Sequence, residues 1–157
     1  MTEALFPATT ARVARQTDED INERIRRDTA ARITYFASHP DEIDRRLEEL
    51  DAEWDIERTL QANAATLALA GTVLGMAADR HWLVLPAMVS GFLLQHALQG
   101  WCPPLPVFRR LGVRTATEIE AERYALKILR GDFATAAGVD GRSPDQRAEE
   151  ALKAVRA

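Results

Sequence analysis

Polar and apolar residues alternate with a helical period in the first part of the chain. Between residues 17 and 37, apolar side chains recur on one face of a predicted helix: Ile21, Ile25, Ile33 and Phe36. Thr17 or Asp18 can cap the N-terminus of this helix. The helix is expected to stop at Ser38-His39-Pro40, because proline suits the first turn of a helix and not its interior. Residues 1–16 show no period and are expected to form a flexible arm.

A second amphipathic segment begins at Asp41. Its narrow apolar stripe has alternating spacings of four and three residues: Ile43, Leu47, Leu50 and Trp54. Asp, Glu and Arg surround the stripe, so this helix is expected to pack antiparallel to the first one or against another chain. No helix-breaking residue separates Trp54 from the apolar sequence that follows. The helix is therefore expected to continue into that sequence.

The centre of the chain is nearly free of charge. No Asp, Glu, Lys or Arg lies between Thr59 and Ala78 or between Trp82 and Phe108. Because a membrane-spanning helix needs about 20 apolar residues, residues 60–78 and 82–101 are predicted spans. The polar turn Asp79-Arg80-His81 joins them, and tryptophans bracket the second span, where interfacial aromatic residues are expected.

Small residues suggest how the two spans pack. The first span is rich in alanine and only marginally hydrophobic, so its insertion is expected to depend on a partner helix. Gly71 and Gly75 form a GxxxG element, and Ala87 and Gly91 answer with the same spacing in the second span. Such faces let helix backbones approach closely in lipid. A homodimer or larger oligomer is expected through this face. The alternative is a soluble bundle whose polar helices bury the hairpin.

The last part of the chain carries clear helix signals. Thr115 and Glu118 make a capping box, and Gly131 is expected to end the helix after about Arg130. Its predicted apolar face is Ile119, Leu126 and Leu129, widened by Tyr124 and Ile128. A short final helix is predicted from Ser143-Pro144. The expected fold is all-α: a flexible arm (1–16), an N-terminal amphipathic helical arm (17–58), a hairpin (59–115) and a C-terminal helical arm (116–157).

Composition and charge exclude some classes of protein and favour others. The 157 residues carry a net charge of −4, and the single cysteine excludes an internal disulfide. Lys and Arg do not cluster in the way that would indicate a nucleic-acid partner. Arginines flank the predicted spans in unequal number, with Arg80 alone in the turn against three on each outer side: Arg45, Arg46 and Arg58, then Arg109, Arg110 and Arg114. This bias favours a membrane protein with both termini in the cytoplasm.

Cys102, in the stretch GWCPPLP, has two interpretations. It is either a reactive thiol at the membrane surface, with Arg109 and Arg110 favouring the thiolate, or a small packing residue where two prolines stop the helix. The reactive interpretation includes redox chemistry, sulfur transfer and metal or haem ligation. His96 lies six residues earlier, about 600° around a continuous helix, which places it off the cysteine's face. We therefore expect no metal site.

His96 stands with Gln95 and Gln99 inside the second span. Polar residues in a span usually face the protein interior. The glutamines are expected to bond Thr66 or Asn63 on the partner helix, and the alternative, a proton or ion relay, would need an oligomer. The sequence has no phosphate-binding loop, nucleophile-elbow serine or plausible catalytic triad. It therefore predicts neither an enzyme nor a bound cofactor.

Two motifs point to a family. Gly100-Trp101-Cys102-Pro103, followed by Leu111-Gly112-Val113-Arg114-Thr115, resembles the end of the YgaP-like transmembrane domain, a small bacterial inner-membrane hairpin family of unknown function. The resemblance covers roughly residues 59–115. It implies two spans that associate in the inner membrane, with Gly100, Pro103, Gly112 and Thr115 as the membrane-exit motif. Trp54-Asp-Ile-Glu-Arg58 departs from the Asn-x-Gly-x-x-Asp-Arg element with which the family usually opens.

Three functions remain open at this stage. The first is an oligomeric interaction or scaffold protein embedded in membrane lipid. The second is a sulfur or redox accessory protein that uses Cys102, suggested by relatives of the resembled family that are fused to a rhodanese. The third is a soluble helical-bundle adaptor.

Overall fold

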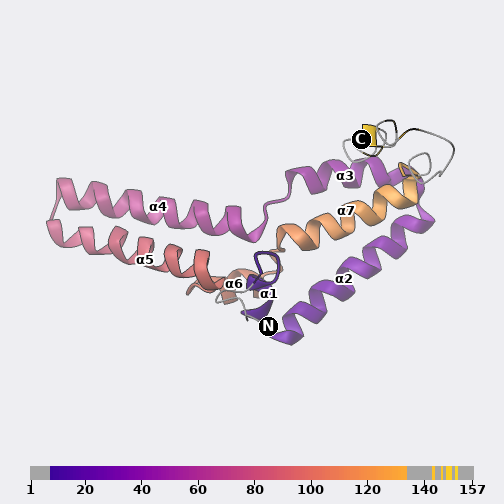
Figure 1. The fold of residues 1–157 in the computed structure, drawn as a ribbon. Helices are drawn as coiled ribbons and strands as arrows, with labels where there is room; N and C mark the ends of the chain where they lie inside the picture. Colours follow the sequence, from indigo (N-terminus) through magenta and orange to yellow (C-terminus); the bar gives the residue numbers. More distant parts are fainter. Residues whose placement is uncertain (1–7, 134–142, 144–145, 147, 150, 152–157) are drawn as a thin grey trace. The chain divides into compact units, whose positions relative to one another are not determined.

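The computed structural model describes residues 8–133, 143, 146, 148, 149 and 151. Every element in this part of the chain is helical, and it contains no strand, which confirms the all-α prediction. The α-helices are α1 (Arg12–Arg15), α2 (Glu19–Ser38), α3 (Ile43–Ala52), α4 (Ile56–Ala77), α5 (Val84–Gln99), α6 (Leu105–Arg110) and α7 (Ala116–Arg130). Two 3₁₀ helices, η1 (Pro40–Glu42) and η2 (Arg80–Leu83), join α2 to α3 and α4 to α5 (Figure 1). The final helix predicted from Ser143 falls mostly outside the described residues.

The chain divides into two compact units. The first comprises Met1–Arg27 and Trp54–Glu118, and the second comprises Asp28–Glu53 and Ile119–Ala157. Each unit therefore combines two segments that lie apart in the sequence.

A helical hairpin, α4–η2–α5, dominates the first unit, and its two helices run side by side (Figure 1). Asp79 caps the connecting turn, because its carboxylate accepts from the backbone N–H of His81 at 2.9 Å. Gly71 and Gly75 let the α4 backbone approach η2 and the start of α5 closely. A Cβ atom at Gly71 would lie 2.7 Å from Pro86 Cδ, and one at Gly75 would lie 2.5 Å from Leu83 Cδ2.

The GxxxG element thus packs within one chain. Gly91 has no atom within 4 Å of a built Cβ, and Ala87 is exposed. Within the hairpin, the expectation that Ala87 and Gly91 pack against Gly71 and Gly75 is wrong. In the hairpin, η2 and the first turn of α5 fill that place instead.

A small core closes the base of the hairpin in the first unit. Its buried members come from α1, α4, α6 and the loop after α5: Val13, Ile56, Leu60, Cys102 and Leu105. The Ile56 N–H donates to the Arg114 carbonyl at 2.8 Å and ties the start of α4 to the loop before α7. Residues 12–15 were expected in a flexible arm, but Val13 is 3% exposed. Its burial fixes α1 in this core.

The second unit packs α3 against the C-terminal part of α2 and most of α7. Its buried cluster is Phe36, Ile43, Leu47, Leu50, Ile119 and Leu126. Glu122 is fully buried on α7, where its carboxylate accepts from Arg46 Nε at 2.9 Å and Arg32 Nε at 3.1 Å. These arginines compensate the buried charge.

Two predicted details differ. The helix from Asp41 does not continue into the first span, because it ends at Ala52 and Asp55 caps α4 by accepting from the Arg58 N–H at 2.8 Å. Trp54 lies in this break with an exposed ring, and the Arg58 guanidinium stands 4.3 Å from the ring centroid. On α7, Leu129 is exposed and Glu122 is buried. The ion pairs, which apolar periodicity does not register, explain the buried glutamate.

Candidate functional site

The turn that follows α5 brings Cys102 back to the hairpin. α5 ends at Gln99, and Gly100 adopts a left-handed conformation with φ +81° while its N–H donates to the His96 carbonyl at 2.8 Å. A Cβ at Gly100 would lie 2.6 Å from the Arg12 carbonyl carbon and oxygen. Glycine is therefore required both by the backbone conformation and by the approach of α1.

An ion-paired carboxylate stands at the first turn of α4. Arg12 Nη2 donates to Glu57 Oε1 at 2.8 Å, and Glu57 Oε2 lies 3.0 Å from His96 Nε2. The hydrogen bond from His96 is the main cause that lowers the pKa of Glu57 from its ordinary 4.5 to about 2. Arg12 lowers this pKa further, and together the two outweigh burial, which raises it. Glu57 is therefore ionised at neutral pH, and the helix N-terminus also favours its negative charge.

This carboxylate determines how His96 presents its two ring nitrogens. An ionised carboxylate only accepts hydrogen bonds, so Nε2 carries a proton and donates to Glu57. The side chain of His96 is only 5% exposed, and its buried Nδ1 has no hydrogen-bond partner.

Cys102 is a second side chain near the His96 imidazole. Cys102 is 4% exposed, and its thiol makes no hydrogen bond to Nδ1. Nucleophile–base contacts are often loose in unliganded sites. The expectation that His96 and Cys102 lie on different faces assumed one continuous helix. The left-handed Gly100 removes that assumption and brings the two residues together.

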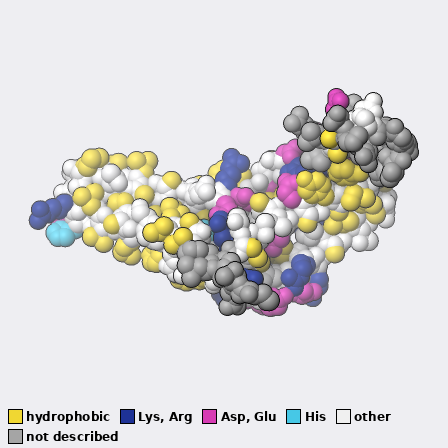
Figure 2. Space-filling view, in the orientation of Figure 1, with side chains coloured by type: hydrophobic (Ala, Val, Ile, Leu, Met, Phe, Trp, Pro, Cys, Tyr) yellow, Lys and Arg dark blue, Asp and Glu magenta, His cyan; other side chains and the backbone are white. Residues whose placement is uncertain are grey.

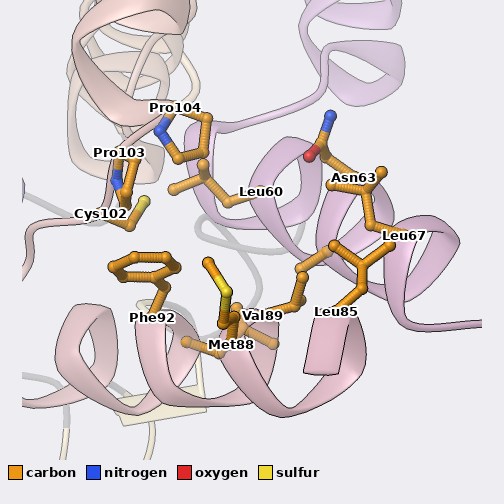
Figure 3. Close-up of a pocket in the computed structure, with 12 residues that line it drawn as sticks. Leu60, Asn63, Leu67, Leu85, Met88, Val89, Phe92, Cys102, Pro103 and Pro104 are labelled. Carbon is orange, nitrogen blue, oxygen red and sulfur yellow. The ribbon is translucent and has the colours of Figure 1, made fainter. Parts of the chain in front are cut away.

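A cavity of about 410 Å³ opens beside the thiol, between α4, α5 and the loop after α5. Figure 3 shows Cys102 on its wall with Leu60 and Phe92, and Met88, Val89 and Leu85 extend the wall along α5. Among the described residues that line it, only Asn63 and Cys102 have a polar side chain. The volume is that of a small-molecule site.

Other predicted site residues contribute less. Thr66 donates to the Ala62 carbonyl of its own helix at 2.8 Å, Gln95 is half-buried and Gln99 is exposed. The expectation of a glutamine bond across to Thr66 is wrong. The polar link between α4 and α5 is instead the Glu57–His96 hydrogen bond.

Arg109 and Arg110 do not support a thiolate in the way expected. Arg109 is fully buried, and its guanidinium donates to both carboxylate oxygens of Glu118 at 2.7 Å. Arg110 lies 3.6 Å from Asp18. Both arginines thus contact acids elsewhere in the first unit.

The residues of the predicted membrane-exit motif have structural roles. Gly112 ends α6 with φ +88°, and Pro103 is exposed at the rim of the cavity. The predicted capping box is confirmed: the Thr115 N–H donates to Glu118 Oε2 at 2.7 Å, and the Glu118 N–H donates to Thr115 Oγ1 at 3.2 Å. These residues define where α6 ends and α7 begins.

Two residues of the site are absent from the sequence-based prediction. The sequence patterns did not single out Glu57, and Arg12 lay in the arm expected to be flexible. A usable signal was the place of Glu57 just before an uncharged span that contains one histidine. Among the described residues, no group of His, Cys, Asp and Glu has the arrangement of a metal site.

Comparison with known proteins gives no relative. No family model, no curated protein and no solved structure matches this chain. The functional argument therefore rests on the chain's own geometry.

Proposed function

We propose that this protein is an integral protein of the bacterial inner membrane, inserted through the α4–α5 hairpin. The observation that carries the proposal is the exposure of apolar side chains on the hairpin: Leu69 is 67% exposed, Met76 76% and Leu94 62%. Only 11% and 6% of the most apolar windows of the two helices are buried. Figure 2 displays hydrophobic side chains along the hairpin and basic and histidine side chains at its tip. In water, so large an apolar surface is a liability unless something covers it.

The hairpin has suitable dimensions. α4 contains 22 residues, about 33 Å at 1.5 Å per residue, and the hydrocarbon core of a bilayer is about 30 Å thick. α5 contains 16 residues, about 24 Å, and η2 extends it by about 8 Å. Asp79, Arg80 and His81 would then lie at the opposite membrane surface from Glu57 and Arg110.

The role that fits this arrangement is an interaction or scaffold protein with both termini in the cytoplasm. The polar surfaces of α2, α3 and α7 would serve protein contacts there. A homo-oligomer would use the lipid-facing side of α5, where Ala87 and Gly91 are open, since Gly71 and Gly75 are already occupied within the chain.

Alkaline-carbonate extraction of expressed protein tests the proposal, with two matched lysine variants. Leu69→Lys places a charge near the middle of α4, at a cost of about 2.5–3.5 kcal/mol for insertion. Leu111→Lys changes a leucine that is 75% exposed outside the spans. We expect wild type and Leu111→Lys in the pellet, released only by detergent, and Leu69→Lys partly in the supernatant.

The soluble alternative gives the opposite result. If wild type were released by carbonate and were monodisperse without detergent, the hairpin would be covered by protein and the membrane proposal would be wrong. The soluble helical-bundle adaptor would then be the function to pursue.

A second candidate function is thiol chemistry at Cys102. The specific observation in its favour is the shared environment of Cys102, His96 and Glu57, which resembles a nucleophile, a base and the group that orients the base. Sulfur carriage predicts that a polysulfide donor transfers one sulfane sulfur to Cys102 and is left one sulfur shorter. The resulting persulfide should be seen by mass spectrometry and be absent from Cys102→Ser. An unmodified thiol after incubation with the same polysulfide would argue against sulfur carriage.

A further inference from the structure

We propose that the outward face of α4 binds one anionic phospholipid of the cytoplasmic leaflet, with the lipid phosphate held by Arg58 beside the Trp54 indole. The inference rests on the proposed membrane insertion and goes beyond it by naming a lipid class and the residues that recognise it. Three features carry it: the face of α4 on which Arg58 lies, its depth along the helix, and a guanidinium that is held in place without an acidic partner.

Arg58 lies on the same face of α4 as the two most exposed large apolar side chains of that helix. Leu69 follows Arg58 by eleven residues and Met76 follows Leu69 by seven, which are close to three and two full helical turns. Leu69 is 67% exposed and Met76 is 76% exposed, and Arg58 is exposed as well. A lipid chain that packs along this face as far as Leu69 therefore has its headgroup beside Arg58.

The spacing between Arg58 and Leu69 matches the depth of one leaflet. Eleven residues of α-helix rise about 16 Å, and half of the hydrocarbon core of a bilayer is about 15 Å thick. With Leu69 at the middle of the membrane, Arg58 lies where the hydrocarbon ends and the lipid phosphates begin. Trp54 lies at the same end of the helix and is 48% exposed, as is usual for tryptophan at a membrane interface.

The Arg58 guanidinium is held in place by an aromatic ring. Its Cζ atom lies over the Trp54 ring, 4.3 Å from the centroid. Cation–π attraction holds a guanidinium without using its N–H groups, so these donors are available for bidentate contact with a phosphate. Among the residues that the structure describes, no carboxylate forms an ion pair with Arg58.

The acids nearest to Arg58 in sequence are engaged elsewhere. The Asp55 carboxylate accepts from the Arg58 backbone N–H at 2.8 Å as the cap of α4, and both oxygens of Glu57 are held by the ion-paired cluster at the base of the hairpin. Gln61 is exposed about one turn further along α4 and offers an amide donor on the same side. An arginine that no acid compensates favours an anionic lipid over a zwitterionic lipid, which carries its own cation.

Native mass spectrometry of the full chain in detergent tests the inference, with dioleoyl-phosphatidylglycerol or dioleoyl-phosphatidylcholine at equal concentration. We expect one phosphatidylglycerol to bind at least about fivefold more tightly than phosphatidylcholine, since one arginine near an anionic lipid surface contributes about that factor. Equal affinities for the two lipids would overturn the proposal. Inorganic phosphate should not displace the lipid, because it makes no contact with the apolar face. Full displacement by phosphate would mean that the site takes a free anion and not a lipid.

Arginine variants separate a lipid site from diffuse attraction by net charge. Arg58→Gln should lower the affinity for phosphatidylglycerol about fivefold and leave the affinity for phosphatidylcholine unchanged. Arg27→Gln removes the same charge from an exposed position on α2 and should change neither affinity. Equal losses in the two variants would show that no particular arginine recognises the lipid, and the site would be wrong.

The comparison of the two lipids on the wild-type chain decides the proposal even if a variant fails to fold. Carbonate extraction separates this proposal from the membrane insertion on which it rests. A wild-type chain that stays in the pellet but shows no preference for phosphatidylglycerol would overturn the lipid site alone. Release of the chain by carbonate would overturn both.

Discussion

Glu57 at the start of α4 and His96 in the last turn of α5 are joined by a 3.0 Å hydrogen bond across 39 positions of sequence. Arg12 from α1 holds the other carboxylate oxygen. The contact fixes the base of the hairpin and orients the imidazole beside Cys102. It also makes the hairpin sensitive to acid.

The sign of the acid dependence follows from Glu57. Its pKa falls from an ordinary 4.5 to about 2 in the folded protein, chiefly through the His96 hydrogen bond. A lowered pKa stabilises the folded state fully above pH 4.5, and this stabilisation is lost as pH falls from there through about 2. Thermal unfolding of the detergent-solubilised protein at stepped pH should show this decline. Glu57→Gln should flatten it, and an unchanged slope in the variant would contradict the assignment.

Gly100 and Gly112 form a matched pair for backbone strain. Both have positive φ, but only Gly100 faces another backbone, with the Arg12 carbonyl 2.6 Å from a built Cβ. Gly112→Ala should cost about 1–2 kcal/mol for the left-handed conformation. Gly100→Ala should cost about 3 kcal/mol, because the clash adds to the same strain. Tryptic cleavage at Arg12 and Arg15 should also accelerate in Gly100→Ala alone. Equal effects of the two variants would mean that α1 does not pack as described.

Leucine substitutions of Gly71 and Gly91 distinguish packing within the hairpin from packing between chains. Leucine at position 71 has to displace Pro86 and Leu85, at 2.7 and 3.1 Å from a built Cβ, and should destabilise the hairpin by about 1–3 kcal/mol. Leucine at position 91 meets no atom within 4 Å. Thermal unfolding should therefore separate the two variants. If Gly91→Leu changes only the oligomer size measured by cross-linking in membranes, α5 forms the contact between copies.

Glu122 and Glu120 provide a comparison of a buried and an exposed ion pair on α7. Glu122 is fully buried against Arg32 and Arg46, so Glu122→Ala removes a buried carboxylate that both guanidiniums contact and should cost about 1–3 kcal/mol, because Arg46 keeps its contact with Glu49. Glu120 pairs with Arg123 at 3.0 Å, but its side chain is 45% exposed. Glu120→Ala should cost about 0–1 kcal/mol. Chemical unfolding of both variants measures the difference, and similar costs would contradict the buried cluster.

Local sequence patterns determined the helices of this protein. The Thr115–Glu118 capping box, the stop at Gly131 and the break near Pro40 rest on interactions between neighbouring residues, and the structure contains each of them. The uncharged centre likewise indicated a hairpin. The break at Trp54 was missed because Asp55 caps α4 without any glycine or proline to mark the boundary.

Tertiary structure alone decided the composition of the candidate site. Arg12, Glu57, His96 and Cys102 belong to four separate segments, and no period in the sequence relates them. Their meeting depends on the antiparallel approach of α4 and α5, allowed by Gly71 and Gly75, and on the left-handed turn at Gly100. Helical periodicity predicts which face a side chain occupies, but it does not predict what a chain reversal places against that face.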